Sequence, residues 1–470
     1  MDTPIINKLK KMKDKNPISF HTPGHKGKST LLNWKELIPE IDITEIPGMD
    51  NLHDPRGIIK ESQSLAAKTF GAKDTLYSVN GTTGGIYIAL GAITNPGDKI
   101  LIQRNSHKSI YNGAILNRLN IEYVYPNYNE NYGIFTGVDP YIIEEKLKED
   151  LEIKAVVLTY PDYYGICSNI KRIAEIVHKY DRILLVDEAH GSHFIFSDKL
   201  PISALKAGAD ITVQSIHKTL PSFTQTSMIH LGTNRVDIKK LKTMSSLYQT
   251  TSPSYLFMAS LEMARAYMEG KGIIRLEENI MRIHELTKEL EKIPRAYLFT
   301  GDEEDNTIFD KDTTKVLFRI DGITGTKVSN ILREDYNIYL EMEDINYCLA
   351  LTSLMNEERD FNLLSRAIEE IANKIPYEEI NTIIPNMLRP NIVLPIYEAF
   401  YKNRKVLDLK EALGKISASF ITPYPPGIPL LCPGERITEE LVEYMRFLMD
   451  KGIEIMGLIG YNREKMEAVD

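Results

Sequence analysis

Between residues 60 and 235, short runs of Ile, Val and Leu alternate with segments in which apolar residues recur at helical spacing. This alternation is typical of a parallel sheet covered by helices on both faces. One predicted helix spans Ile170–Lys179 and is preceded by Ser168 and Asn169, which can cap it. The predicted strands are Lys99–Gln103, Ile121–Tyr125, Ala155–Thr159, Ile183–Val186, Ile211–Gln214 and Ser227–Leu231.

The remaining segments predict a division into four parts. The first 55 residues are rich in turns and predict an arm, and the stretch from about Ser254 to Leu290 predicts a long helical connector. A proline-rich loop at 424–429 precedes a helix that is expected to begin near Thr438. Beyond the connector we expect strands at Val316–Ile320, Tyr339–Glu341 and Tyr347–Leu351 and a helix at Lys327–Glu334. The expected parts are an arm (1–55), a large domain with the connector helix (56–290), a small α+β domain (291–385) and a C-terminal domain (386–470).

Composition narrows the class of protein. A chain of 470 residues with 43% hydrophobic residues can form two or three domains with substantial cores. Its net charge of -9 comes from 65 acidic and 56 basic residues spread along the sequence, which argues against a nucleic-acid surface. The three cysteines are isolated and lack metal-ligand spacing, so we expect no disulfide framework and no metal site. Since the sequence has no apolar run of about 18 residues, we expect no membrane insertion and a cytoplasmic location.

The segment Ser215–Thr219 contains the strongest candidate for chemistry. Lys218 lies 31 positions after Asp187, which ends a predicted buried strand. A deprotonated lysine can form an imine with an aldehyde cofactor, and a buried carboxylate can hold a protonated pyridine nitrogen. Together the two residues indicate pyridoxal 5'-phosphate (PLP). Alternatively, Lys218 is a solvated surface residue and Asp187 caps a helix after the strand.

Other polar residues are expected at the same edge of the sheet. Gly81, Thr82 and Thr83 open a helix after a predicted turn, and the free N–H groups of a helix start favour a phosphate. The pattern is neither a Walker-type loop nor GxGxxG, and it also fits a plain turn. His107 follows the strand Lys99–Gln103 and could stack on a cofactor ring.

Two further histidines follow Asp187. His190 could face the cofactor or the substrate, and His193 is expected to be structural. Because ligands of parallel sheets bind at the carboxyl ends of strands, we expect Thr159, Asp187 and Ser215 to share one crevice.

Collinear strings along the chain resemble the PLP-dependent Orn/Lys/Arg decarboxylase family, particularly its short bacterial biosynthetic arginine decarboxylases. The matching strings are FHTPGHKG (20–27), DITEIPGMDNLHDPRG (42–57), SVNGTTGG (78–85), NSHKS (105–109), YYGIC (163–167), VDEAHGSHF (186–194), SIHKTLPSFTQT (215–226), TTSPSY (250–255) and YPPGIPLLCPGE (424–435). The resemblance implies an α/β PLP-dependent transferase fold of type I, with a mostly parallel seven-stranded sheet in the large domain and smaller α+β C-terminal domains.

The resemblance also implies roles for individual residues. Lys218 would bind the cofactor aldehyde covalently, Asp187 would hold the pyridine nitrogen and His107 would stack on the ring. The phosphate would be held by Gly81, Thr82, Thr83, Ser215 and His217, with His190 beside the cofactor. His217 or Lys218 would return a proton to the substrate. Asp162 departs from the family, which more often has Thr at this position.

The implied reaction is α-decarboxylation of a basic L-amino acid, with arginine giving agmatine, a polyamine precursor, and CO₂. Lysine and ornithine remain alternative substrates. A carboxylate should receive the cationic tail of the substrate, and the candidate acids are Asp42, Glu45, Asp50, Asp54 and Glu435.

Two other functional classes stay open. The same fold supports aminotransferases, for which Arg389 or Arg436 could bind the α-carboxylate, and a non-catalytic regulator is the other alternative. For an enzyme of this fold we expect a homodimer or higher homo-oligomer with shared active sites. The arm at 21–27 and the segment 250–255 are candidates for reaching a neighbour's cofactor.

Overall fold

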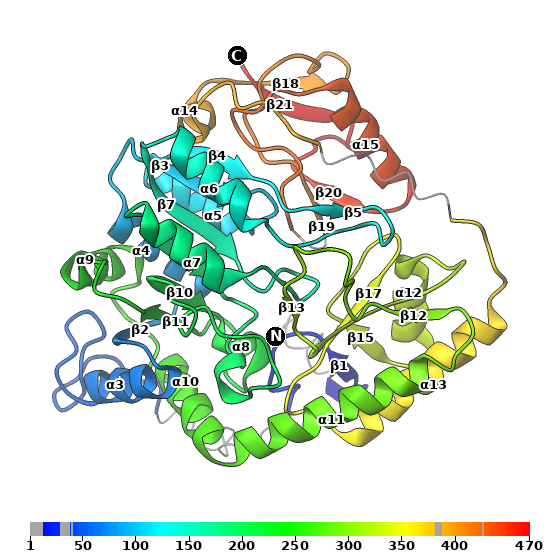
Figure 1. Ribbon diagram of the computed structural model, residues 1–470, viewed down its shortest axis with the longest axis horizontal. Coiled ribbons are helices and arrows are strands. Elements are labelled where there is room, and N and C mark those ends of the chain that lie inside the picture. Colours follow the sequence, from blue (N-terminus) through cyan, green and yellow to red (C-terminus); the bar gives the residue numbers. More distant parts are fainter. Residues whose placement is uncertain (1–12, 29–37, 39–40, 381–387, 425–426) are drawn as a thin grey trace, which may run out of the picture.

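A seven-stranded sheet forms the centre of the protein, as seen in the computed structural model, which describes all residues except 1–12, 29–37, 39–40, 381–387 and 425–426 (Figure 1). The strand order is β2-β11-β10-β9-β7-β3-β4, and only β11 runs antiparallel to its neighbours. The strands are β2 (Asp74–Ser78), β3 (Lys99–Gln103), β4 (Asn120–Val124), β7 (Ile153–Thr159), β9 (Ile183–Asp187), β10 (Ile211–Gln214) and β11 (Ser227–Leu231). The expected mostly parallel sheet is thus confirmed.

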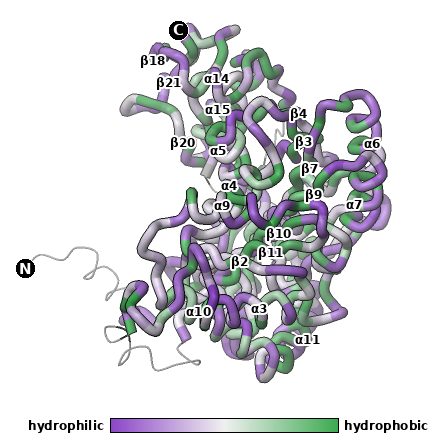
Figure 2. The backbone as a smooth tube through the Cα atoms, turned by 90° about the vertical axis from the view of Figure 1, so that its left-hand side faces the viewer, coloured by the Kyte–Doolittle hydropathy of each residue, from purple (hydrophilic) through white to green (hydrophobic). Residues whose placement is uncertain are grey.

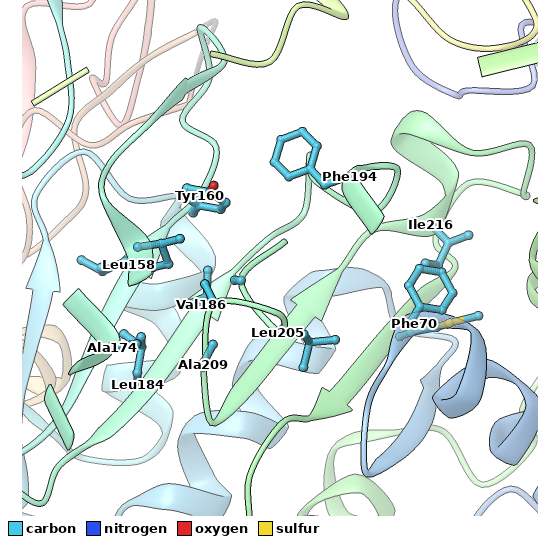
Figure 3. Packing of buried hydrophobic residues seen from close by; sticks show 14 of the residues in the cluster. Phe70, Leu158, Tyr160, Ala174, Leu184, Val186, Phe194, Leu205, Ala209 and Ile216 are labelled. Carbon is cyan, nitrogen blue, oxygen red and sulfur yellow. The ribbon is translucent and has the colours of Figure 1, made fainter. Parts of the chain in front are cut away.

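Alternating side chains of the sheet enter two separate cores. Ile100 and Ile102 of β3 pack on one face, whereas Leu101 between them packs on the other. Figure 3 shows the second core, in which Leu158 of β7 and Val186 of β9 point to the same side. Burial on both faces explains why these strands are continuous apolar runs in the sequence.

Helices cover both faces of the sheet. Side chains of α4, α5 and α9 enter the core around Ile100, and those of α3, α6, α7 and α10 enter the core around Leu101. In the hydropathy-coloured trace, β3, β7 and β9 lie beside α6 and α7, whose outer side at the right edge is largely hydrophilic (Figure 2). The helices are α3 (Ile58–Phe70), α4 (Gly81–Ile93), α5 (Lys108–Leu116), α6 (Pro140–Glu149), α7 (Ile170–Lys179), α8 (Ile216–Thr219), α9 (Ile238–Tyr248) and α10 (Tyr255–Tyr267), with a 3-10 turn η1 (Phe194–Phe196).

A four-stranded antiparallel sheet follows the connector. The connector itself comprises α10, the π-helical segment η2 (Met268–Gly272) and α11 (Ile273–Leu290), with non-helical backbone at Gly270. The second sheet has the order β12-β14-β17-β16 and packs against α11, α12 and α13. Its elements are β12 (Ala296–Leu298), β14 (Lys315–Ile320), α12 (Gly325–Asp335), β16 (Met342–Glu343), β17 (Cys348–Leu351) and α13 (Glu358–Lys374).

The C-terminal region has its own small core and two strand pairs, β18 with β21 and β19 with β20 (Figure 1). The expected helix begins directly after its cap, Thr438, whose side chain accepts a hydrogen bond from the Leu441 N–H. The elements are α14 (Ile396–Tyr401), β18 (Arg404–Asp408), β19 (Thr422–Tyr424), α15 (Glu439–Asp450), β20 (Glu454–Met456) and β21 (Lys465–Val469). Residues 425–426 of the predicted proline-rich loop lie outside the described residues.

Three further strand pairs are small; two of them connect regions that are distant in sequence, and the third is a local hairpin. The arm supplies β1 (Ile18–Phe20), which pairs in parallel with β15 (Ile338–Leu340). The turn-rich arm therefore contains a strand that was not predicted from the sequence, because its hydrogen-bond partners lie more than 300 positions away. The other pairs are β5 (Tyr128–Asn129) with β6 (Ile134–Phe135) and β8 (Ile166–Cys167) with β13 (Asp310–Lys311). None of the helices in the described parts of the chain is long and apolar enough to cross a bilayer.

Candidate functional site

A cavity of about 330 Å³ lies at the carboxyl ends of the central strands. Thr159 ends β7, Asp187 ends β9 and Ser215 follows β10, so the sheet brings the three together as expected. The cavity is lined by every residue that the sequence assigned to a cofactor: Gly81, Thr82, Thr83, His107, Asp187, His190, Ser215, His217 and Lys218. Residues spread over 138 positions of sequence thus share one site.

Lys218 lies on the short helix α8 and contacts His190. Its Nζ is 3.0 Å from His190 Nε2, while the buried Nδ1 of His190 has no hydrogen-bond partner. Burial lowers the pKa of Lys218, although the carboxylates of Asp187 and Glu341 oppose this effect. Burial and the nearby Lys218 also lower the pKa of His190 well below its usual value. The lysine is therefore shifted toward the deprotonated form that imine formation needs.

Asp187 provides a buried carboxylate at the floor of the cavity. Its side chain is 3% exposed, and Oδ1 accepts a hydrogen bond from the Ala189 N–H at 3.1 Å. Burial raises the pKa of Asp187 to about 6, and the charge of Lys218 opposes that rise. A buried carboxylate of this kind would be stabilised by a cationic partner entering the cavity.

Hydroxyl groups and the start of α4 form another part of the cavity wall. Thr82 Oγ1 lies 2.6 Å from Ser215 Oγ and 3.0 Å from Ser227 Oγ, and Thr83 is exposed to the cavity. The N–H of Gly81 already donates to the Gln225 carbonyl at 2.9 Å. Gly81 has φ +68°, so its contribution is a backbone turn that glycine adopts readily. The helix start at Thr82 and Thr83 leaves amide donors available for an anion.

Two further histidines complete the wall. His107 caps α5, and its Nδ1 contacts the hydroxyl and the N–H of Ser109 at 2.8 and 3.2 Å. His217 Nδ1 donates to the Thr226 carbonyl at 2.9 Å. Burial lowers the pKa of each ring to about 4, so both imidazoles are neutral at pH 7. His193 does not line the cavity and instead contacts Asp312 at 3.2 Å, in keeping with its expected structural role.

The arm supports the Lys218 helix of its own chain. The Gly24 N–H donates to the His217 carbonyl at 2.6 Å, and a Cβ at position 24 would lie 2.7 Å from the Leu220 carbonyl oxygen. Glycine is therefore required by this close approach of the arm to α8. The segment 250–255 also contacts its own chain, since the Tyr255 hydroxyl donates to the Asp50 carbonyl.

Two of the acids proposed for the substrate tail have structural partners instead. Asp50 accepts hydrogen bonds from the N–H groups of Arg56, Gly57 and Ile59 at the start of α3. Glu435 is 1% exposed and pairs with the buried Arg104 at 3.3 Å. Neither carboxylate lines the cavity, and Asp42, Glu45 and Asp54 do not line it either.

Three residues of the site were not predicted from the sequence: Tyr163, Gln225 and Glu341. Tyr163 and Gln225 line the cavity, and the charge of Glu341 acts on Lys218 and His217. YYGIC and SFTQT belong to the matching strings and could have indicated the first two. Glu341 lies on no such string. It is bound to the arm near the site, where its Oε2 accepts a hydrogen bond from the Thr22 N–H at 2.7 Å.

Comparison with known proteins shows the family of the chain. The family model of the Orn/Lys/Arg decarboxylase major domain matches residues 3–308, and the model of the C-terminal domain of that family matches residues 394–458. The chain belongs to the Orn/Lys/Arg decarboxylase family. Within this family it is similar to the arginine decarboxylase of Bacillus subtilis, with 36% identity over 97% of this chain and 95% of that protein. The arginine decarboxylase of Bacillus anthracis is 35% identical over the same shares.

Solved structures of lysine decarboxylases have the same fold. The Francisella novicida enzyme superimposes with a TM-score of 0.78 at 23% identity, covering 91% of this chain and 74% of that one. The constitutive enzyme of Escherichia coli also gives a TM-score of 0.78, at 20% identity over 100% of this chain and 82% of that one. At these identities the likeness establishes the family's fold.

Proposed function

We propose that this Orn/Lys/Arg decarboxylase family member is a PLP-dependent decarboxylase that converts L-arginine into agmatine and CO₂. The observation that carries the proposal is the 3.0 Å contact between Lys218 Nζ and His190 Nε2, in a cavity whose floor is the buried Asp187. Arginine is favoured over lysine and ornithine because relatives at 35–36% identity over nearly the whole chain are named arginine decarboxylases. Lysine decarboxylases are 24–26% identical.

The donor set of the cavity fits PLP. Lys218 would bind the aldehyde, and Asp187 would hold the protonated pyridine nitrogen. Thr82, Thr83 and Ser215 would hold the phosphate, with Gly81 shaping the turn and His217 beside them. His107 would cover a ring face. Bound PLP supplies an electron sink for the pair of electrons left on the substrate carbon when the carboxylate departs as CO₂.

The protein's own groups handle the protons. With its pKa lowered by burial, Lys218 can exchange a proton with His190 Nε2, which lies within hydrogen-bond distance. Lys218 then returns a proton to the substrate carbon. His217, the other candidate, is neutral, and its Nδ1–H is already donated to the Thr226 carbonyl. Burial of Lys218, His190 and His217 limits their contact with water and so preserves these protonation states.

An aminotransferase is less well supported. Arg389 stacks on Tyr125, with its guanidinium carbon 5.0 Å from the ring centroid, and Arg436 donates to the Gly414 carbonyl. Neither lines the cavity around Lys218, so neither is placed to bind an α-carboxylate there. Intact Lys218 and Asp187 likewise disfavour a non-catalytic regulator.

The proposal extends to assembly and location. A homodimer or larger homo-oligomer with shared sites is proposed by analogy with the fold, together with a cytoplasmic location and a role in polyamine biosynthesis. Sedimentation that gave a fully active monomer would contradict the assembly.

Competition between substrates tests the reaction. The PLP-loaded protein is incubated with equimolar arginine, lysine and ornithine, and products are identified by mass spectrometry. We expect agmatine to exceed cadaverine and putrescine at least about tenfold, since one well-placed polar contact discriminates by at least that factor. Predominant cadaverine or putrescine would reject arginine, and conversion of the cofactor to its amine form with an added α-keto acid would indicate an aminotransferase.

A further inference from the structure

Lys315 is a fully buried cation at the start of β14, beneath the turn that follows β7. It is 0% exposed, and its Nζ donates to the carbonyl oxygens of Asp162 and Tyr163 at 2.9 and 2.8 Å. Both bonds join the four-stranded sheet to the backbone of one turn. A buried ammonium that satisfies two main-chain carbonyls fixes their position strongly.

The backbone of this turn packs closely against Lys315. Gly165 has φ +92°, and a Cβ there would lie 3.1 Å from the Cβ and Cδ of Lys315. The Asp312 N–H donates to the Gly165 carbonyl at 2.8 Å, and the Asp162 carboxylate accepts the Ile166 N–H at 2.7 Å. The turn is thus closed internally by Asp162 and clamped from below by the segment 312–315.

The clamped turn carries Tyr163 into the active-site cavity. The Tyr163 ring lies edge-on to the His190 ring, with centroids 6.1 Å apart, and Tyr163 lines both the Lys218 cavity and a neighbouring apolar cavity of about 200 Å³. Tyr163 therefore separates His190 from that second space. His190 in turn contacts Lys218 Nζ.

We propose that Lys315 is a positioning residue of the active site: it holds the turn at residues 160–165 and, through Tyr163, keeps His190 in place against Lys218. The inference rests on the proposed function. It gives the four-stranded sheet a direct part in the chemistry, although Lys315 itself does not line the cavity.

The charge of Lys315 also acts on His190, because it lowers the pKa of that imidazole. Burial contributes most to the lowered pKa of His190, followed by the charges of Lys218 and Lys315. Burial lowers the pKa of Lys315 itself to about 8, so it is still mostly charged at pH 7. The charged and titratable groups that act on these two residues are Asp162, Asp312, Glu341 and Lys218 around Lys315, and Lys218, His107, His217 and Lys315 around His190.

The main test variant is Lys315→Met, which keeps the side-chain length and removes both the donor and the charge. Lys240→Met is its matched control, because the Lys240 Nζ also donates to a main-chain carbonyl, that of Thr94 at 2.6 Å, but at the C-terminal end of α4 and not at the turn. Three quantities are measured on PLP-loaded protein: the visible circular-dichroism band of the cofactor, kcat and KM for arginine, and the pH dependence of kcat.

For Lys315→Met we expect the visible dichroism to fall at least about twofold and kcat about tenfold, with KM changed less than threefold. The acid limb of the pH profile should move up by about half to one pH unit, because removal of a nearby cation raises the pKa of His190. Lys315→Arg, which retains a charge, should keep the limb at its wild-type position. Lys240→Met should match the wild type in all three measurements.

A wild-type pH profile and dichroism band in folded Lys315→Met would overturn the proposal, even if its thermal midpoint had dropped. If that variant fails to fold, Tyr163→Leu decides, since it leaves the Lys315 bonds intact and removes the covering ring. Removal of the ring should hydrate His190 and raise its pKa, so the acid limb of the pH profile should again move to higher pH. An acid limb at its wild-type position would contradict the proposal. Failure of the proposed function is distinguishable, because the wild-type protein would then release no CO₂ from arginine.

Discussion

Burial controls the protonation of the groups around Lys218. Desolvation is the largest contribution to the shifted pKa values of Lys218, His107 and His217, and it favours the neutral form of each. Asp187 is shifted in the opposite sense, to about 6, because burial also favours its neutral form. A charged ligand that binds in the cavity would therefore stabilise the charged forms of these buried groups.

Asp187 gives a prediction for the cofactor-free protein. Its pKa is about 6 when folded and 3.8 by its ordinary value, so the folded state holds the proton more tightly. Its contribution to stability is fully present below pH 4 and is lost as pH rises through 6. Asp187→Asn should therefore raise the free energy of unfolding by about 3 kcal/mol at pH 7.5 and by only about 1 kcal/mol at pH 4.5.

Urea unfolding of the cofactor-free variant and wild type at both pH values measures this difference. The exposed Asp181, which pairs with Arg235, provides the control, and Asp181→Asn should show no gain at pH 7.5. An equal gain from Asp187→Asn at both pH values would contradict the assigned burial cost.

At the scale of elements, the sequence predicted what depends on local pattern. Three of the six strands predicted between residues 60 and 235 have the predicted bounds, β3, β10 and β11, and each is buried on both faces. β2 was missed because Asp74–Ser78 is an edge strand with polar residues at both ends. β1 was missed because its partner β15 lies in the other sheet region, and no local pattern encodes such a pairing.

The residues of the candidate site also divide into those placed by local pattern and those placed by long-range packing. Lys218, Asp187 and His107 lie at predicted strand ends or helix starts, so spacing was sufficient to bring them together. Glu341 and Lys315 reach the site only through contacts between the arm, the turn at 160–165 and the four-stranded sheet. Those contacts depend on tertiary packing that the sequence pattern does not specify.

The Arg104–Glu435 pair joins the end of β3 to the C-terminal region. Arg104 also donates to the carbonyls of Pro429 and Leu430 at 2.6 and 2.9 Å, and Glu435 accepts the Tyr123 hydroxyl at 2.7 Å. Glu435→Gln would leave the buried guanidinium without its counter-charge. We expect a loss of about 3 kcal/mol in the free energy of unfolding.

Chemical denaturation measures this loss, with Glu175→Gln as the control. Glu175 pairs with Arg172 on the surface of α7, and an exposed pair of this kind contributes roughly 0.5 kcal/mol or less. If Glu435→Gln cost no more than Glu175→Gln, the pair would not anchor the C-terminal region.

At the scale of the whole molecule, three regions converge on one lysine. The central sheet supplies the cavity, the arm supports α8 through Gly24, and the four-stranded sheet clamps the turn that carries Tyr163. Residues far from Lys218 in sequence therefore determine where it lies. Activity should therefore depend on all three regions.

Lys218 is the residue on which the account depends most directly. Wild-type protein, Lys218→Ala and the surface control Lys206→Ala are loaded with PLP, and visible absorbance and CO₂ release from carboxyl-labelled arginine are measured. Wild type and Lys206→Ala should show the imine absorbance band and release CO₂, whereas Lys218→Ala should lose the band and at least about 10³-fold of the rate. A Lys218→Ala protein that retained both the band and the wild-type rate would contradict the account.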